Sequence, residues 1–207
     1  MSKPVLLTGF EPFGKHRVNS SWEASRLVRK EMAAHVIARR LPVDYLAARE
    51  RLYVYLARHR PAICLCTGLT SSPLSGVERL ARKPVQFAEI EGPEVLYGAW
   101  PWDEAEEALR KAARPAILSE DAGQYVCEST YWALLAFRLQ FGYPAYAAFL
   151  HVPPLSPDLT AETIAAAVSG ILRARLNSAP ELARPKRRRP HLEHPGRSGA
   201  MNTGGKP

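Results

Sequence analysis

Two residues of this 207-residue chain could act together as a nucleophile and its base. Cys127 follows a glycine-containing loop and begins a predicted helix, where unpaired N–H groups and the helix dipole stabilise a thiolate. His151 ends an apolar run that is typical of a buried strand. An imidazole that accepts the thiol proton activates the sulfur for attack. Alternatively, Cys127 is a small buried apolar side chain and His151 is a structural histidine.

Short apolar runs and helical periodicity predict the elements that would position these residues. The strands are expected at residues 5–8, 36–43, 62–67, 116–118 and 146–150. The helices are expected at residues 20–32, 45–60, 104–114, 127–141 and 159–176. The β-α-β-α-β order of the first half favours a largely parallel sheet with helices on both faces.

This topology would place both groups at one edge of the sheet. His151 lies at the C-terminal end of its strand, which is the edge of an open α/β sheet where ligands usually bind. The helix that begins at Cys127 would start at the same edge, because it follows the strand at residues 116–118. We therefore expect the thiol and the imidazole to lie close together.

A Cys–His pair usually takes a third, orienting group, most often Asp, Glu or Asn. Glu78 lies in the irregular segment after the third strand, and Asp158 follows His151. Asp158 precedes a helix and is interpreted as its N-cap, as is Asp103 for an earlier helix. Glu78 is therefore the better candidate, and its alternative is an exposed loop carboxylate.

Two aromatic rings, Phe10 and Phe13, fall on the loop expected after the first strand, where large apolar side chains are otherwise avoided. They predict an apolar slot for a flat or small group. Asn19 is expected to support that loop by bonding its backbone. Alternatively, the rings only cover the edge of the sheet.

The segment at residues 68–102 is the least regular part of the chain, because Gly, Pro and Ser interrupt it. Residues 85–87 and 95–97 are at best short strands. Long irregular segments inside compact domains commonly serve function. We expect this segment to be mobile and to close over the substrate.

The net charge of +8 is concentrated at the C-terminal end. Residues 184–207 contain seven Lys or Arg residues and one acidic residue, so they carry +6 of that charge. This segment has too few apolar residues to offset the entropy of ordering. We expect residues 1–183 to form a single catalytic domain, followed by a basic disordered tail at residues 184–207. Phosphate binding by residues 186–189 is the alternative, and a nucleic-acid partner is not expected.

The three cysteines, an odd number, argue against a disulfide framework. Cys64 and Cys66 alternate along the third strand and are expected to pack rather than to bind zinc. The sequence contains no run of about 18 apolar residues and no pattern of a secretory signal. We expect a cytoplasmic protein with reduced thiols and no membrane association.

Four segments, in this order, resemble the type I pyroglutamyl peptidases (pyrrolidone-carboxylate peptidases), a family of cysteine peptidases. They are residues 7–14 (LTGFEPFG), 18–23 (VNSSWE), 125–127 (YVC) and 150–153 (LHVP). The resemblance spans about residues 5–168 and excludes the tail. It implies a three-layer α/β/α sandwich around a largely parallel mixed sheet, of the phosphorylase/hydrolase-like type.

The resemblance implies that Cys127 is the nucleophile, His151 the base and Glu78 the carboxylate that orients the base. The implied activity is hydrolysis of the amide bond after an N-terminal pyroglutamyl (5-oxoprolyl) residue through a thioester acyl-enzyme, with no metal or other cofactor. The alternatives are a non-catalytic relative that binds a small cyclic or peptide ligand and another α/β hydrolase or phosphorylase. The oligomeric state stays open, a homo-oligomer included.

The resemblance also implies a substrate site. Phe10 and Phe13 resemble the rings that sandwich the pyroglutamyl lactam, and Asn19 and Leu69 would complete the site. A neutral lactam suits an apolar slot with a few polar groups.

The chain departs from the family pattern near the reacting centre. Residues 68–73 lack the usual glycine pair and arginine, and Glu128 replaces the customary asparagine after the nucleophile. The arginine that helps the oxyanion hole in the family is also missing. The backbone N–H of Cys127 is the expected oxyanion donor.

Overall fold

The computed structural model describes residues 4–111 and 116–179. The central sheet has the strand order β2-β1-β3-β8-β4-β7. Its strands are β1 (Val5–Phe10), β2 (Val36–Leu41), β3 (Ile63–Leu69), β4 (Ser75–Glu78), β7 (Ala116–Ser119) and β8 (Tyr146–Val152). The helices are α1 (Ser20–Glu31), α2 (Tyr45–His59), α3 (Trp102–Lys111), α4 (Val126–Phe141) and α5 (Ala161–Ser178). A separate ribbon pairs β5 (Leu80–Arg82) with β6 (Val95–Tyr97).

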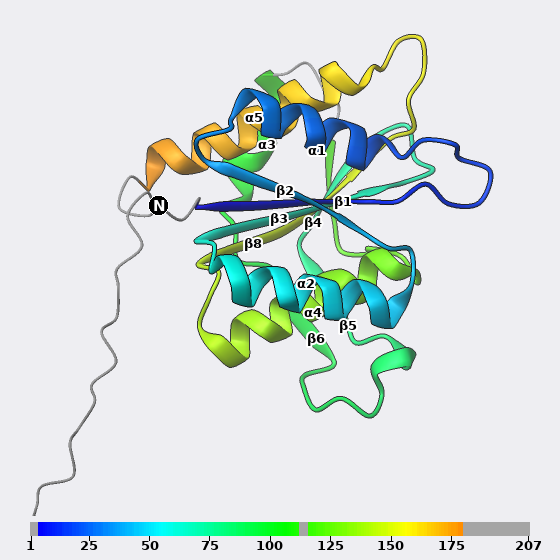
Figure 1. The fold of residues 1–207 in the computed structure, drawn as a ribbon, viewed down its shortest axis with the longest axis vertical. Coiled ribbons are helices and arrows are strands. Elements are labelled where there is room, and N and C mark those ends of the chain that lie inside the picture. Colours follow the sequence, from blue (N-terminus) through cyan, green and yellow to red (C-terminus); the bar gives the residue numbers. More distant parts are fainter. Residues whose placement is uncertain (1–3, 112–115, 180–207) are drawn as a thin grey trace, which may run out of the picture.

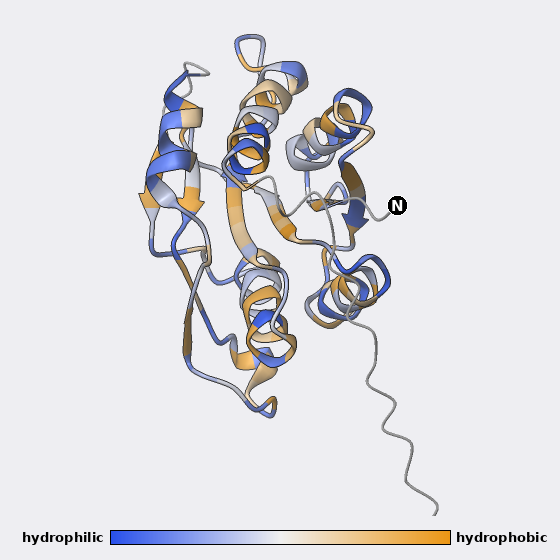
Figure 2. Ribbon diagram, turned by 90° about the vertical axis from the view of Figure 1, so that its left-hand side faces the viewer, coloured by the Kyte–Doolittle hydropathy of each residue, from blue (hydrophilic) through white to orange (hydrophobic). Residues whose placement is uncertain are grey.

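The helices cover both faces of the sheet, as the sequence predicts. In Figure 1, α1, α3 and α5 lie above the sheet and α2 and α4 lie below it. Each side has its own apolar core, and the strands between the helices are largely orange in Figure 2. Leu65 of β3 belongs to the upper core, while Cys64 and Cys66 belong to the lower one. The predicted α/β/α sandwich and the packing of the two cysteines are confirmed.

The sheet is mixed because two of its strands run against the others. β1, β2, β3 and β8 are mutually parallel, whereas β4 is antiparallel to β8 and parallel to β7. The expected route to Cys127 is therefore wrong, since β7 does not end at the C-terminal edge of β8. The loop at residues 120–125 instead returns the chain to that edge, where α4 begins.

Several local expectations differ from the structure. Residues 85–87 form the 3-10 helix η1 (Val85–Phe87) rather than a strand. Asp103 lies in the first turn of α3, which begins at Trp102, so it is not the N-cap. The N-cap of α5 is Thr160, whose side chain accepts from the Thr163 N–H, and not Asp158. The predicted tail at residues 184–207 lies outside the described residues.

Within the described ranges, no helix is long and apolar enough to cross a membrane.

The start of α1 approaches β1 closely because Gly9 has no side chain. A Cβ atom at Gly9 would lie 2.6 Å from the carbonyl oxygen of Ser21 and 2.7 Å from the Cα of Trp22. Both atoms belong to the backbone and cannot rotate away. This contact fixes the start of α1, and with it the loop at residues 11–18, against the end of β1.

We expect Gly9→Ala to lower the free energy of unfolding by about 2 kcal/mol or more, because α1 must shift away from β1. The measurement is urea denaturation followed by circular dichroism. Gly170→Ala is the matched control: Gly170 lies inside α5 and its added Cβ would meet only the Ala108 carbonyl oxygen at 3.9 Å. That variant should gain about 0.5–1 kcal/mol. Equal unfolding midpoints for Gly9→Ala and wild type would contradict this account.

Candidate active site

The first part of the site is a buried pair of side chains on neighbouring strands. Glu78 ends β4, His151 lies near the end of β8, and Nδ1 of the imidazole lies 2.8 Å from Oε1 of the carboxylate. Glu78 is 2% exposed and His151 9% exposed. The strand register explains the contact, because Gly76 stands opposite His151 and Glu78 is two residues further on, on the same face. The alternative of an exposed loop carboxylate is therefore wrong.

Glycines flank His151 on both sides. Gly68 of β3 and Gly76 of β4 are its two partners across the sheet. A Cβ at Gly68 would lie 2.7 Å from Sγ of Cys127, and a Cβ at Gly76 would lie 3.0 Å from Oε1 of Glu78. The sulfur and the carboxylate thus occupy the space that two ordinary side chains would fill.

Cys127 is the second residue of α4 and is partly exposed. The N-cap of the helix is Tyr125, whose side chain makes no capping hydrogen bond in the described structure. The N–H groups of the first turn have no acceptor within the helix, so they remain available to an anion at this end.

The imidazole is held in a strongly polar environment although it is buried. Burial lowers the pKa of His151, but hydrogen bonds with Cys127 and Glu78 and the negative charges of both groups raise it from 6.5 to about 9. An imidazolium at neutral pH is the natural counterion of a thiolate. The geometry therefore suits a nucleophilic thiol paired with a histidine that a carboxylate orients.

These side chains open into a large cavity of about 940 Å³. All seven residues that the sequence singled out for the site line it: Phe10, Phe13, Asn19, Leu69, Glu78, Cys127 and His151. Its volume is at the upper end of the range for small-molecule sites. The cavity therefore has room for a lactam and for further residues of a peptide.

Only one of the two predicted rings lies on a loop. Phe10 is the last residue of β1 and is buried, and its N–H donates to Oγ of Ser21 over 3.1 Å. Phe13 lies on the loop, is 39% exposed and packs on the ring of His16 with centroids 5.5 Å apart. Phe10 is thus a fixed wall of the cavity, and Phe13 is its accessible counterpart.

Asn19 supports the loop, as predicted from its residue type. Its Nδ2 donates to the Glu11 carbonyl over 3.0 Å, and its Oδ1 accepts from the N–H and the hydroxyl of Ser21 at 3.1 and 2.7 Å. The side chain is buried, and these bonds occupy its amide. Asn19 therefore shapes the cavity wall through the backbone of the loop.

The irregular segment at residues 68–102 divides into two parts. Seven residues between positions 69 and 78 line the cavity: Leu69, Thr70, Ser71, Ser72, Leu74, Gly76 and Glu78. Of the described residues between Glu78 and Ile117, none lines it. The ribbon packs on α4 instead: Nε1 of Trp132 donates to the Pro93 carbonyl over 2.9 Å, and its ring contacts Phe87. Residues 79–101 therefore lie away from the cavity in this structure, and the closure of the segment over a substrate stays a prediction.

The cavity also has walls that sequence reasoning missed. Ile117 and Ser119 of β7 line it, as do Tyr45 at the start of α2 and Tyr125 before Cys127. The hydroxyl of Tyr45 donates to the Gln124 carbonyl over 3.1 Å, which joins α2 to the loop before the nucleophile. Side chains point alternately to the two faces of a strand, so Ile117 and Ser119 share one face of β7. This period of two is the sequence signal that could have indicated them.

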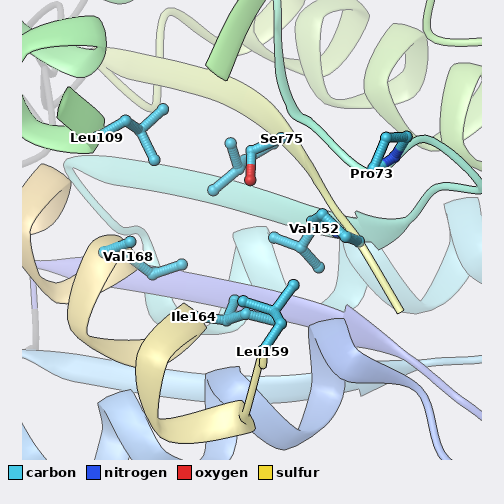
Figure 3. A pocket seen from close by; sticks show the side chains of 10 residues that line it. Pro73, Ser75, Leu109, Val152, Leu159, Ile164 and Val168 are labelled. Carbon is cyan, nitrogen blue, oxygen red and sulfur yellow. The ribbon is translucent and has the colours of Figure 1, made fainter. Parts of the chain in front are cut away.

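A second cavity, of about 20 Å³, lies on the opposite face of the sheet and is drawn in Figure 3. It is enclosed by strands β4 and β8 and by side chains of α3 and α5, among them Leu109, Ile164 and Val168. Ser75 is the only polar side chain among the described residues that line it. A space of this size holds about one water molecule and offers it too few partners. It is a packing gap and not a ligand site.

Comparisons with known proteins agree with this arrangement. Residues 3–176 match the model of a protein family described as pyroglutamyl peptidase. A pyrrolidone-carboxylate peptidase from Thermococcus onnurineus is 32% identical over 198 residues, which cover 84% of this chain and 99% of the relative. One from Chromobacterium violaceum is 36% identical, over 73% of this chain and 78% of the relative.

Solved structures share the fold. The pyrrolidone carboxyl peptidase from Thermococcus litoralis superposes with a TM-score of 0.75 at 27% identity, over 87% of this chain and 96% of that chain. Pyroglutamyl peptidase I from Bacillus amyloliquefaciens gives a TM-score of 0.70 at 26% identity, over 83% of this chain and 95% of that chain. The resemblance seen in the four short segments is confirmed, and the chain belongs to the pyroglutamyl peptidase family.

Proposed function

We propose that the protein is a cysteine exopeptidase that hydrolyses the amide bond after an N-terminal pyroglutamyl residue of peptides. The observation that carries the proposal is the contact of 2.8 Å between Glu78 and His151 in the cavity that Cys127 also lines. The names of the similar peptidases support the same substrate.

The reaction starts from the thiolate of Cys127 and the protonated imidazole of His151. The sulfur attacks the pyroglutamyl carbonyl carbon, and the negative charge moves to the carbonyl oxygen. The backbone N–H of Cys127, in the first turn of α4, is placed to donate to that oxygen. The tetrahedral intermediate collapses as His151 gives its proton to the leaving amine, which releases the shortened peptide.

The second half of the reaction regenerates the Cys127 thiolate. The neutral imidazole of His151 takes a proton from water, and the oxygen of that water attacks the thioester carbon. Breakdown of the second intermediate releases the Cys127 thiolate and pyroglutamic acid, which loses its proton to solvent, and His151 keeps the proton that it took from water. Glu78 accepts a hydrogen bond from the Nδ1–H group throughout, so the other ring nitrogen stays directed to the reacting atoms.

Recognition of the lactam falls to the apolar walls of the cavity. Phe10 and Phe13 would contact the two faces of the ring, and Leu69 would close the slot from β3. These three side chains carry no charge, so the slot between them suits the neutral cyclic amide.

We also propose a cytoplasmic location, because all three cysteines are free and a reducing compartment keeps thiols in that form.

Cys127→Ser should lower turnover of a pyroglutamyl chromogenic amide by about a thousandfold or more, since a hydroxyl is a far poorer nucleophile in this pair. Iodoacetamide should inactivate the wild type, and a chelator should leave the rate unchanged. Cys64→Ala is the control, because Cys64 is fully buried and lies outside the cavity lining. Absence of turnover by the wild type would contradict the proposed function, and full turnover by Cys127→Ser would contradict the mechanism.

Phe13→Ala should raise KM for the same amide about tenfold and leave kcat within about threefold, because the ring contributes binding and no chemistry. Its exposure allows the truncation without loss of core packing. Val18→Ala is the control: Val18 is exposed on the same loop and lies outside the cavity lining. An unchanged KM for Phe13→Ala would remove this ring from the proposed slot.

His151 should contribute stability that depends on pH. Its pKa is about 9 in the folded protein and 6.5 for the free side chain, so folding is favoured by its protonated form. This contribution is fully present below pH 6.5 and is lost as the pH rises through about 9. The loss of stability caused by His151→Asn should therefore shrink by roughly 3 kcal/mol over that range, measured by urea denaturation.

His59→Asn provides the comparison. Burial and the charges of Arg39 and Arg58 lower the pKa of His59 below 6.5, so its effect should stay constant between pH 6.5 and 9. An effect of His151→Asn that is equally constant would show that the imidazole is not held as a cation.

A further inference from the structure

Glu128, the residue after the nucleophile, is a buried carboxyl that the mechanism above does not use. It lies in the first turn of α4 and is 5% exposed. Its Oε1 accepts a hydrogen bond from the backbone N–H of Arg82, at the end of β5. Its Oε2 has no partner among the described residues.

Tyr131 makes a matching contact one turn further along the helix. Its hydroxyl donates to the backbone carbonyl of Glu78 over 2.9 Å, and its ring is fully buried. Positions 128 and 131 are three apart, so they share one face of α4. Two side chains from the helix that carries the nucleophile therefore bond the backbone of residues 78 and 82, the segment that carries the third member of the site.

A third contact ties the same segment to the loop before α4. The Arg82 guanidinium donates to the carbonyl of Glu120 over 2.6 Å, and Arg79 pairs with the Glu120 carboxylate at 3.3 Å. That pair is exposed, so it adds little by itself. The buried contacts of Glu128 and Tyr131 are the stronger restraint.

The surroundings of Glu128 raise the pKa of its carboxyl above the usual value. Burial raises the pKa of the Glu128 carboxyl, the Arg82 N–H and guanidinium lower it, and the charges of Asp121 and Glu78 raise it further. The contact with the Arg82 N–H needs an acceptor oxygen at this position and does not need a negative charge. A glutamine has the same shape and the same acceptor.

We propose that Glu128 and Tyr131 are positioning residues, which hold the Glu78 carboxylate against His151 and so maintain the ion pair of His151 with Cys127. The expected effect of these residues on kcat rests on the proposed function. Loss of either contact frees the backbone at residues 78–82, the carboxylate moves away from the imidazole, and the thiolate loses its counterion.

The test compares Glu128→Ala, Glu128→Gln and Tyr131→Phe with the wild type by kcat and KM on a pyroglutamyl chromogenic amide. The rate of alkylation of Cys127 by iodoacetamide is measured in parallel. Glu128→Ala should lower kcat and the alkylation rate about 10- to 100-fold, with KM within about threefold. Glu128→Gln should keep both rates within about threefold of wild type, because glutamine retains the acceptor oxygen. If the positioning role needed a negative charge at position 128, Glu128→Gln would lower the rates as Glu128→Ala does.

Tyr131→Phe removes one oxygen and keeps the buried ring, so it reports on the same segment even if Glu128→Ala does not fold. It should lower both rates about three- to tenfold. Leu135→Ala is the control for a general loosening of α4, because Leu135 is buried in the same helix and its apolar side chain cannot hydrogen-bond the backbone of residues 78–82. It should lower the thermal midpoint and leave both rates unchanged. Equal losses in Leu135→Ala and Glu128→Ala would overturn the proposal.

A double-mutant cycle gives the decisive result. If Glu128 acts through Glu78, adding Glu128→Ala to Glu78→Ala should cause no further loss in either rate. A further tenfold loss in that background would overturn the proposal. The alkylation rates also separate this proposal from the function: a wild type that hydrolyses no pyroglutamyl amide, but shows the expected order of alkylation rates, refutes the substrate and supports the positioning role.

Discussion

The site depends on the absence of side chains at the two positions that face His151 across the sheet. Gly68 and Gly76 pair with it from opposite sides, and a Cβ atom on either would meet the sulfur of Cys127 or the carboxylate of Glu78. The hydrogen-bonded register of three strands therefore sets the positions of Glu78 and His151, and Gly68 leaves room beside them for the sulfur at the start of α4. Strands hold geometry more tightly than loops do, which suits a reaction that tolerates little displacement.

The reversal of β4 follows from the same constraint. A strand parallel to β8 would carry its last residue to the C-terminal edge of the sheet, beyond the imidazole. Antiparallel pairing instead sets Gly76 opposite His151 and brings Glu78 back beside Phe149, within reach of Nδ1 from the buried side. The carboxylate thus approaches the imidazole from inside the protein. The opposite side of the ring is left to the sulfur and to the substrate.

Much of this could be predicted from the sequence, for identifiable reasons. β1, β3 and β8 are continuous apolar runs, and the loop-to-helix position of Cys127 and the strand-end position of His151 follow from them. β4 could not be predicted in the same way, because the sequence Ser-Gly-Val-Glu contains only one large apolar residue. Its strand conformation comes from pairing with β8 and β7, which is a tertiary effect.

The burial of Glu128 could not be predicted from the sequence either. An acidic residue in the first turn of a helix ordinarily faces solvent and complements the dipole. Here the segment at residues 79–101, which contains β5 and β6, covers that face of α4. The surface on which this segment packs is a property of the folded chain and is not marked in the sequence.

The anchoring of the loop at residues 11–18 separates two properties of the protein. The proposed catalytic groups come from β4, α4 and β8, whereas the loop is fastened at its base by Asn19 and by the approach of α1 to Gly9. Between those anchor points, neither the length of the loop nor the exposed ring of Phe13 affects how the strands pair around His151. Mutation can therefore vary this loop while the reactive centre stays intact, so that the choice of substrate can drift during evolution independently of the chemistry performed on it.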